Sequence, residues 1–326
     1  MRLRHLPLAL ALVAGTLATA PAAIASSSAL AFDMAVADRQ VTEFTLEHNG
    51  AVHRIAGLER LDVELEGPDG RPGAMYVARV DGRPATLVRL GDALDIAFDD
   101  AAPTSAAARS RRSGEWTADY TGFGDLVTSD DAEPYDPEAD EPGGDGLNVW
   151  IFLHDQSKEP DHAHFLNWYT TWWVREMQKD IVPGKKVRVF LKTNVPGLTD
   201  LDYHAGTAAQ RLKDVHLRGF EHVHDAHGAP GQLARYVLFV DEPAANWGED
   251  VVGVALDNGK SALASRRGPR HIVAHEIGHT IGGVHELAQK AWCASSMAGY
   301  VWLTASCLWY TTPNQRGIRD YLLPRL

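Results

Sequence analysis

The stretch HEIGHTIGGVHE, residues 275–286, contains three histidines, two glutamates and three glycines. Apolar residues recur through its first half and just before it at the spacing of an amphipathic helix. On that helix His275 and His279 are one turn apart, so both imidazoles project from the same side. Gly282 allows the chain to leave the helix through a backbone conformation that other residues resist. The spacing therefore predicts that His285 returns to meet the first two histidines.

Three neutral imidazoles in this arrangement can bind one zinc ion and leave its fourth position open for water, as in catalytic zinc sites. Glu276 follows the first ligand directly and can reach a zinc-bound water as a general base. We therefore expect His275, His279 and His285 to bind one Zn²⁺ and Glu276 to be the catalytic residue. The alternative is a polar helix in a protein that binds no metal.

The pattern HExxHxxGxxH resembles the signature of the metzincin clan of zinc proteases at every fixed position. Met297, twelve residues beyond His285, resembles the methionine of that clan's Met-turn. The resemblance implies a zinc endopeptidase with a twisted mixed sheet, an active-site helix and a small C-terminal subdomain. It also implies an extended substrate that pairs with an edge strand. Met297 would form an apolar floor below the metal, and Tyr300 would either stabilise the oxyanion or be an exposed structural tyrosine.

The subfamily stays open between two alternatives. Glu286, directly after the third histidine, is similar to the astacin pattern, and we expect it to orient a neighbouring group. Gly283 departs from that pattern, because astacins carry an aromatic residue there. The order of predicted strands before the helix is at least as similar to that of reprolysins.

The N-terminus has the pattern of a secretory signal peptide, predicted as residues 1–25. Arg2 and Arg4 precede an apolar run, and small residues precede Ser26. An uncleaved membrane anchor is the alternative. We expect a secreted protein without a membrane span after signal removal, with the periplasm as the other possible location.

Charge divides the remaining chain into two parts. The net charge of the 326 residues is −12. Residues 26–146 carry 25 acidic and 10 basic side chains, whereas residues 147–326 carry 18 acidic and 19 basic ones. A nucleic-acid-binding protein needs a basic face, so this distribution argues against a nucleic-acid partner. We expect two modules and a monomer.

The first part, residues 26–128, shows short strand patterns broken by Gly, Asp and Pro turns. We interpret it as a β-rich propeptide, followed by an acidic, proline-rich linker at residues 129–146. A calcium-binding loop is the alternative for the linker. Asp125 ends a segment, TGFGD, that faintly resembles the astacin propeptide motif, so its carboxylate is a candidate blocker of the open zinc position. A folding chaperone or a separate binding domain is the alternative for the module.

The second part, residues 147–326, is predicted to be the zinc metalloprotease domain. Strand patterns at 147–155, 185–193 and 234–242, with a further candidate at 251–256, alternate with helical patterns. An aromatic stripe at residues 162–180 has helical spacing and is interpreted as core. This alternation predicts a layered α/β (α+β) domain.

The sequence also allows predictions for the two cysteines and for the histidines outside the metal motif. Cys293 and Cys307 bracket Met297, and we expect a disulfide between them, with two free thiols as the alternative. A histidine-rich stretch at residues 216–227, with His204 before it, suggests either a second metal site or, as we expect, a solvated polar loop. His271 is expected to be a packed histidine.

These features together predict a secreted zinc endopeptidase that is made as a zymogen and acts on protein or peptide substrates. Its partners would be those substrates and its own propeptide. The rival function is a catalytically inactive secreted module for zinc binding or adhesion. The presence of Glu276 favours the enzyme, because a purely zinc-binding role does not need that carboxylate.

Overall fold

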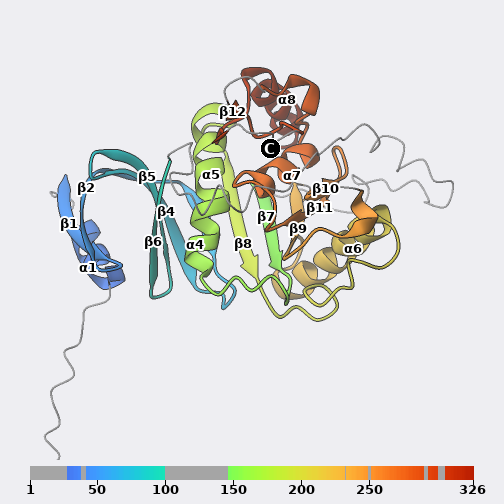
Figure 1. The fold of residues 1–326 in the computed structure, drawn as a ribbon, viewed down its shortest axis with the longest axis horizontal. Coiled ribbons are helices and arrows are strands. Elements are labelled where there is room, and N and C mark those ends of the chain that lie inside the picture. Colours follow the sequence, from blue (N-terminus) through green and yellow to red (C-terminus); the bar gives the residue numbers. More distant parts are fainter. Residues whose placement is uncertain are drawn as a thin grey trace, which may run out of the picture.

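The computed structural model describes residues 28–37, 42–99, 146–231, 233–248, 251–289, 293–299 and 305–326. Within these ranges one sheet of eleven strands dominates the molecule, and a second sheet has two short strands (Figure 1). The large sheet contains both parallel and antiparallel neighbours. The expected α/β class with a twisted mixed sheet is confirmed.

The front module, which we define as residues 28–37 and 42–99, is β-rich as expected. Its elements are α1 (Ser28–Ala37), β1 (Glu43–His48), β2 (Ala51–Arg60), β3 (Val63–Glu66), β4 (Pro72–Val80), β5 (Arg83–Leu90) and β6 (Ala93–Phe98). Asn49–Gly50 joins β1 to β2 and Asp81–Gly82 joins β4 to β5, and all four residues have positive φ. Such pairs form the tight turns that match the twist of antiparallel hairpins.

The C-terminal module, residues 146–326 within the described ranges, supplies the other half of the large sheet. Its strands are β7 (Gly146–Leu153), β8 (Lys186–Lys192), β9 (Ala234–Val240), β10 (Gly253–Ala255) and β11 (Ser261–Ser265). The order is β8-β7-β9-β11-β10, with parallel pairing except between β11 and β10. Gly146, which we assigned to the linker, already belongs to β7. The rest of that linker lies outside the described residues.

Helices cover both faces of this half of the sheet. One face carries α4 (His162–Leu166), η1 (Asn167–Thr171), α5 (Trp172–Glu176), η2 (Met177–Ile181) and α7 (Ile272–Thr280), whereas α6 (Ala208–His227) covers the other. The aromatic stripe is core, as predicted: Trp172 and Trp173 pack in one cluster with alternate residues of β7. Trp150 and Phe152 point to the opposite face and pack against α6. Among the described residues, no helix has the length and apolar character of a membrane span.

The remaining elements lie around the site or at the C-terminus. They are η3 (Ala245–Trp247), η4 (His285–Leu287), β12 (Cys293–Ala294), β13 (Ala305–Ser306), α8 (Thr312–Leu322) and η5 (Leu323–Arg325). Figure 1 shows α8 beside β12 and beyond α7, away from the large sheet. This C-terminal part corresponds to the small subdomain that the sequence suggested.

The histidine-rich stretch is helical, so the expectation of a polar loop is wrong. Helix α6 runs from Ala208 to His227 and includes all of residues 216–227. Leu212, Val215 and Val223 are buried on one side of it. These apolar residues recur at helical spacing and mark the buried side of the helix, where His216 is also buried. His222, His224 and His227 lie on the more exposed part of the same helix.

The two modules share one sheet. Strand β3 of the front module pairs in parallel with β8, in register from Val63 opposite Val187 to Glu66 opposite Phe190. The charge distribution suggested two separate modules, but their strands form a continuous hydrogen-bonded surface. The predicted domain boundaries, and the role of the front part as a propeptide, stay predictions.

Candidate metal centre

Helix α7 positions the first two histidines. It spans Ile272–Thr280 and is buried along its whole length, with α7 packed against β10 and β11. His275 and His279 are one turn apart and are only 5% and 7% exposed. The helix is therefore held on several sides, and both imidazoles are presented from a rigid element.

Glycines allow the chain to return to the helix. Gly282 has a φ of 94°, and Gly283 N–H donates to Gly278 C=O at 2.8 Å. A Cβ at Gly278 would overlap the sulfur of Met297, and a Cβ at Gly283 would lie 3.0 Å from it. Met297 is fully buried, and its sulfur lies against Gly278 of the helix and Gly283 of the turn. The contact of Gly278 with Met297 was not predicted.

The three ring nitrogens converge. The Nε2 atoms of His275 and His279 are 3.3 Å apart, those of His279 and His285 are 3.0 Å apart, and those of His285 and His275 are 3.1 Å apart. Two nitrogens bound ~2.0–2.1 Å from a tetrahedral zinc would be separated by ~3.3 Å. Within the described ranges these residues are the one group of three or more potential ligands that could hold a metal ion. The donor set and its spacing fit zinc.

The opposite ring nitrogens have acceptors that orient two of the histidines. His275 Nδ1 lies 2.6 Å from the Ser296 carbonyl oxygen, and His279 Nδ1 lies 2.9 Å from Asp257 Oδ1. A proton on each Nδ1 would donate to these oxygens and leave the Nε2 lone pair for a metal. Burial holds the pKa of His275 well below its ordinary value, which keeps that ring neutral.

Asp257 is the site residue that sequence reasoning missed. It lies two residues after the end of β10, and the hydrogen bond from His279 lowers its pKa. The only available signal was an acidic residue at the end of a predicted strand, which is common in proteins that bind nothing. Its role depends on the proximity of β10 to α7, which spacing along the chain does not reveal.

Glu276 is buried beside the histidines. Its side chain is about 1% exposed, and Oε1 lies 4.0 Å from His275 Nε2. Oε2 has no hydrogen-bond partner among the described residues. Gly253 on β10 makes room for the carboxyl group, because a Cβ there would overlap it. Burial raises the pKa of Glu276 well above its ordinary value, because the charged carboxylate loses its hydration there.

His271 lies one turn before His275 and does not join the cluster. It is fully buried, and its ring lies nearly parallel to that of His275 with centroids 6.2 Å apart. Neither ring nitrogen has a hydrogen-bond partner in the part of the chain that the structure describes. Burial lowers its pKa to about 4, so this histidine is packed and neutral.

The segment after His285 carries the predicted disulfide. Cys293 and Cys307 are bonded, with their Cα atoms 5.4 Å apart. Met297 lies between them in sequence, so the bridge ties the two ends of the segment that places its sulfur against α7. Tyr300 lies outside the described residues. Among the described residues, the Glu286 side chain makes no hydrogen bond or ion pair, so its expected orienting role stays a prediction.

The histidines of α6 pack against aromatic rings. His216 stacks on Tyr236, with ring centroids 5.5 Å apart, and His227 lies 4.8 Å from the ring of Trp150. Burial lowers the pKa of His216 to about 4. No second cluster of three potential metal ligands occurs among the described residues, so the alternative of a second metal site gains no support there.

A buried carboxyl group is linked to helix α7 through hydrogen bonds. Glu176 Oε1 accepts hydrogen bonds from Tyr310 N–H at 2.7 Å and Gln315 Nε2 at 2.9 Å. Tyr310 in turn donates its hydroxyl proton to the Ala274 carbonyl, directly before His275. Burial raises the pKa of Glu176 to about 7. The folded protein therefore binds this proton more tightly than the unfolded chain does.

We expect Glu176→Gln to weaken the pH dependence of stability. The protonated carboxyl group contributes to the free energy of unfolding. This contribution is complete below ~4.5, the pKa of the group in the unfolded chain, and is lost as the pH rises through about 7, its pKa in the folded protein. Between pH 5 and pH 8 the parent should lose roughly 2 kcal/mol more stability than the variant. Urea unfolding at both pH values measures this difference. The exposed Glu47→Gln serves as control, and an equal pH effect in parent and Glu176→Gln would contradict the assignment.

Comparison with known proteins gives similarity to solved structures. No family model matches the chain, and no curated protein matches it. Among solved structures, the chain is similar to metalloproteinase-II from Bacteroides fragilis, with 15% identity and a TM-score of 0.48. The similarity covers 88% of this chain and 94% of that one. The chemistry of the present site has to be interpreted from its own side chains.

Proposed function

We propose that this chain is a secreted zinc-dependent endopeptidase of the metzincin type, with one zinc ion held by His275, His279 and His285. The observation that carries the proposal is the convergence of three Nε2 atoms at 3.0–3.3 Å beside the buried carboxyl group of Glu276. A site that only stored zinc would have no need for that carboxyl group, nor for the space that Gly253 leaves for it.

Each side chain has a distinct task in the proposed reaction. A zinc ion bound here would lower the pKa of a water molecule and polarise the scissile carbonyl. Glu276 accepts the proton of the attacking water and passes it to the leaving amine. The acceptors behind His275 and His279 hold the two rings in the orientation that presents Nε2. Met297 keeps the floor of the site apolar.

The edge of the sheet supports an extended peptide as substrate. In the described part of the chain, β10 is last in the sheet order and pairs with β11 alone. It carries Gly253, next to Glu276, and is followed by Asp257, the acceptor for His279. A peptide added to the outer edge of β10 would bring its backbone past the proposed base. Main-chain pairing of this kind suits protein substrates of varied sequence.

The contacts at the end of the front module support the proposal that the following segment, residues 100–145, regulates the peptidase. Asp99 pairs with Arg175 at 2.6 Å, and Arg270 Nη1 donates to the Phe98 carbonyl at 2.8 Å. Arg270 lies two residues before α7, so the chain enters residues 100–145 close to the active-site helix. Asp125 belongs to those residues, which lie outside the described ranges. We retain its carboxylate as the candidate blocker of the metal's open position in a zymogen.

A cleavage assay separates the enzyme from the rival zinc-binding or adhesion module. We expect purified protein, after removal of any blocking segment, to cleave unfolded casein and generate new internal N-termini that mass spectrometry identifies. A zinc chelator should stop the cleavage, and added zinc should restore it. Zinc bound at the site without any new N-termini would favour the rival.

Asp257→Asn should weaken zinc binding without abolishing it. The amide keeps the size of the side chain but is a poorer acceptor for the His279 ring proton, and such supporting contacts typically contribute ~10- to 100-fold in metal affinity or activity. Competition with a chromophoric chelator measures the affinity. Asp225→Asn, an exposed aspartate of α6, is the matched control. Equal zinc affinity in both variants and the parent would remove Asp257 from the site.

A further inference from the structure

The contact between the two modules begins with strand pairing. Strand β8 is bonded to β7 on one side and to β3 of the front module on the other. Loss of β3 would leave β8 as an exposed edge with unpaired backbone groups. The C-terminal module therefore uses the front module to complete its sheet.

Apolar side chains of the front module lie in the main core of the C-terminal module. Those that share the cluster with β7, β8 and the helices α4 to η2 are Leu61, Val63, Leu65, Met75, Val88 and Leu90. All six are at most 7% exposed. Removal of the front module would uncover them and the residues they cover, which water opposes in proportion to the apolar area.

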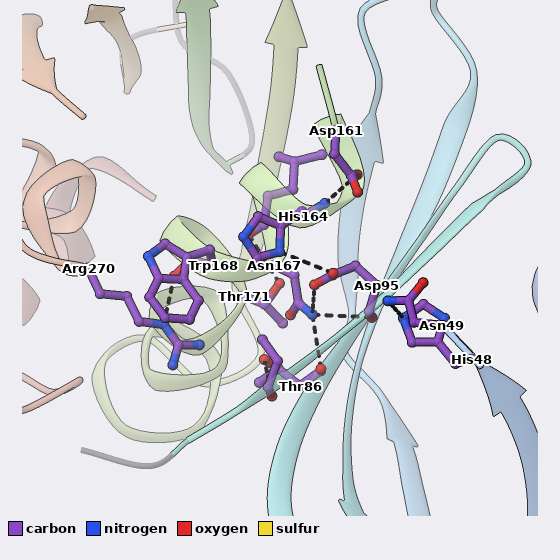
Figure 2. Close-up of polar contacts among 12 residues, drawn as sticks. His48, Asn49, Thr86, Asp95, Asp161, His164, Asn167, Trp168, Thr171 and Arg270 are labelled. Carbon is purple, nitrogen blue, oxygen red and sulfur yellow. Dashed lines mark hydrogen bonds and ion pairs between the residues drawn. The ribbon is translucent and has the colours of Figure 1, made fainter. Parts of the chain in front are cut away.

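A polar cluster around the buried Asn167 links β5 and β6 to α4 and η1 at the same contact (Figure 2). Asn167, which is fully buried, donates from Nδ2 to Asp95 Oδ2 at 2.7 Å and to the Thr86 carbonyl at 3.0 Å. His164 Nδ1 lies 3.1 Å from Asp95 Oδ1. The hydrogen-bond partners of Asn167 Nδ2 all belong to the front module. Without that module, the amide would exchange these protein acceptors for water, and each such hydrogen bond contributes a net ~1 kcal/mol, more where the acceptor is a carboxylate.

Three ion pairs at the margin of the contact between the modules have the same polarity. Glu59 pairs with Lys179 at 2.8 Å, Glu64 with Arg188 at 2.7 Å, and Glu66 with Lys192. In each pair the front module supplies the acid and the C-terminal module the base. Lys192 and Glu66 are the most enclosed of these, with side chains 10% and 23% exposed. The contact is thus complementary in charge.

We propose that the front module is a lasting part of the protein: it stays bound to the C-terminal module after the chain is cut within residues 100–145. The front module would stay bound whether or not the protein is a peptidase. The role of the cut in activation, however, rests on the proposed function. In the sheet order β3 is separated from β10 by β8, β7, β9 and β11. The retained module therefore covers the edge of the sheet far from β10, and activation releases the connecting segment and leaves the module in place.

The test uses the full chain with one recognition sequence for a site-specific protease inserted after Arg112. After complete cutting, gel filtration in native buffer should show both fragments in one peak, and they should separate only in denaturant. Fragments that separate in native buffer would overturn the proposal. Casein cleavage and zinc content are measured on the same fractions. A protein without peptidase activity can still co-elute, and separated fragments can still be active, so the two proposals fail independently.

Charge reversal tests whether the described contact is the one that holds the fragments. Lys192→Glu places two carboxylates together in a partly buried pair and should weaken fragment association at least ~10-fold. Glu66→Lys combined with Lys192→Glu should restore most of the affinity, which excludes a general folding defect. Lys213→Glu, on the exposed side of α6, is the matched control. Equal dissociation constants for Lys192→Glu and Lys213→Glu would contradict the proposed contact.

Discussion

Glu276→Gln should keep the fold and the metal but lose peptidase activity by about 10²- to 10⁴-fold, the usual contribution of a general base. The glutamine fits the space that Gly253 leaves and can still hydrogen-bond a water molecule. It cannot take the proton of that water. The loss should appear in kcat more than in KM, because the substrate makes the same contacts with the edge of β10 in both proteins.

The controls for this variant are its zinc content and its unfolding midpoint. Both should stay close to those of the parent, because no ligand changes and because the amide replaces a carboxyl group that has no hydrogen bond to Oε2 among the described residues. Activity within about tenfold of the parent would mean that another residue is the base. Lost zinc in the variant would instead give Glu276 a role in binding.

His279→Ala should remove most of the bound zinc and, with it, the activity. The Nε2 atom of His279 lies 3.3 Å from His275 Nε2 and 3.0 Å from His285 Nε2, so it is one of the three converging ligand atoms. Two imidazoles alone leave too few ligands for a tightly bound catalytic zinc. Elemental analysis of purified protein should fall from near one zinc per chain to a small fraction of that.

The matched control is His224→Ala, because His224 is an exposed histidine of α6. It should retain zinc and activity. Stability gives a second measurement, since a ligand that binds only the folded state raises its free energy of unfolding. Added zinc should therefore raise the melting temperature of the parent and of His224→Ala, but not that of His279→Ala. Undiminished zinc in His279→Ala would remove this residue from the ligand set.

The convergence of the three histidines could be predicted because it depends on local geometry. One helical turn separates His275 from His279, and Gly282 permits the reversal that brings His285 back. The main strands of the C-terminal module were predictable for a related reason. Long runs of β-branched and aromatic residues, as in β7 and β9, form buried strands in nearly any packing.

Features that depend on tertiary contact could not be predicted from the sequence. Strand β11 consists of small residues, SALAS, with no strand signal, and it is set by burial between β9 and β10. Asp257 acts through a loop that only the sheet brings to α7. The pairing of β3 with β8 joins segments more than a hundred residues apart in sequence, and neither strand specifies its partner. The second half of α6 was misjudged because histidines and charged residues dominate its composition, and only Phe220 and Val223 mark its apolar side.

Zinc titration of the metal-free protein tests the central claim most directly. After the connecting segment is cut and the metal is removed with a chelator, casein cleavage should be lost. On stepwise addition of zinc, activity should rise in proportion to the metal and stop rising at one zinc per chain. Full activity in the metal-free protein, or no activity at one bound zinc per chain, would contradict the account.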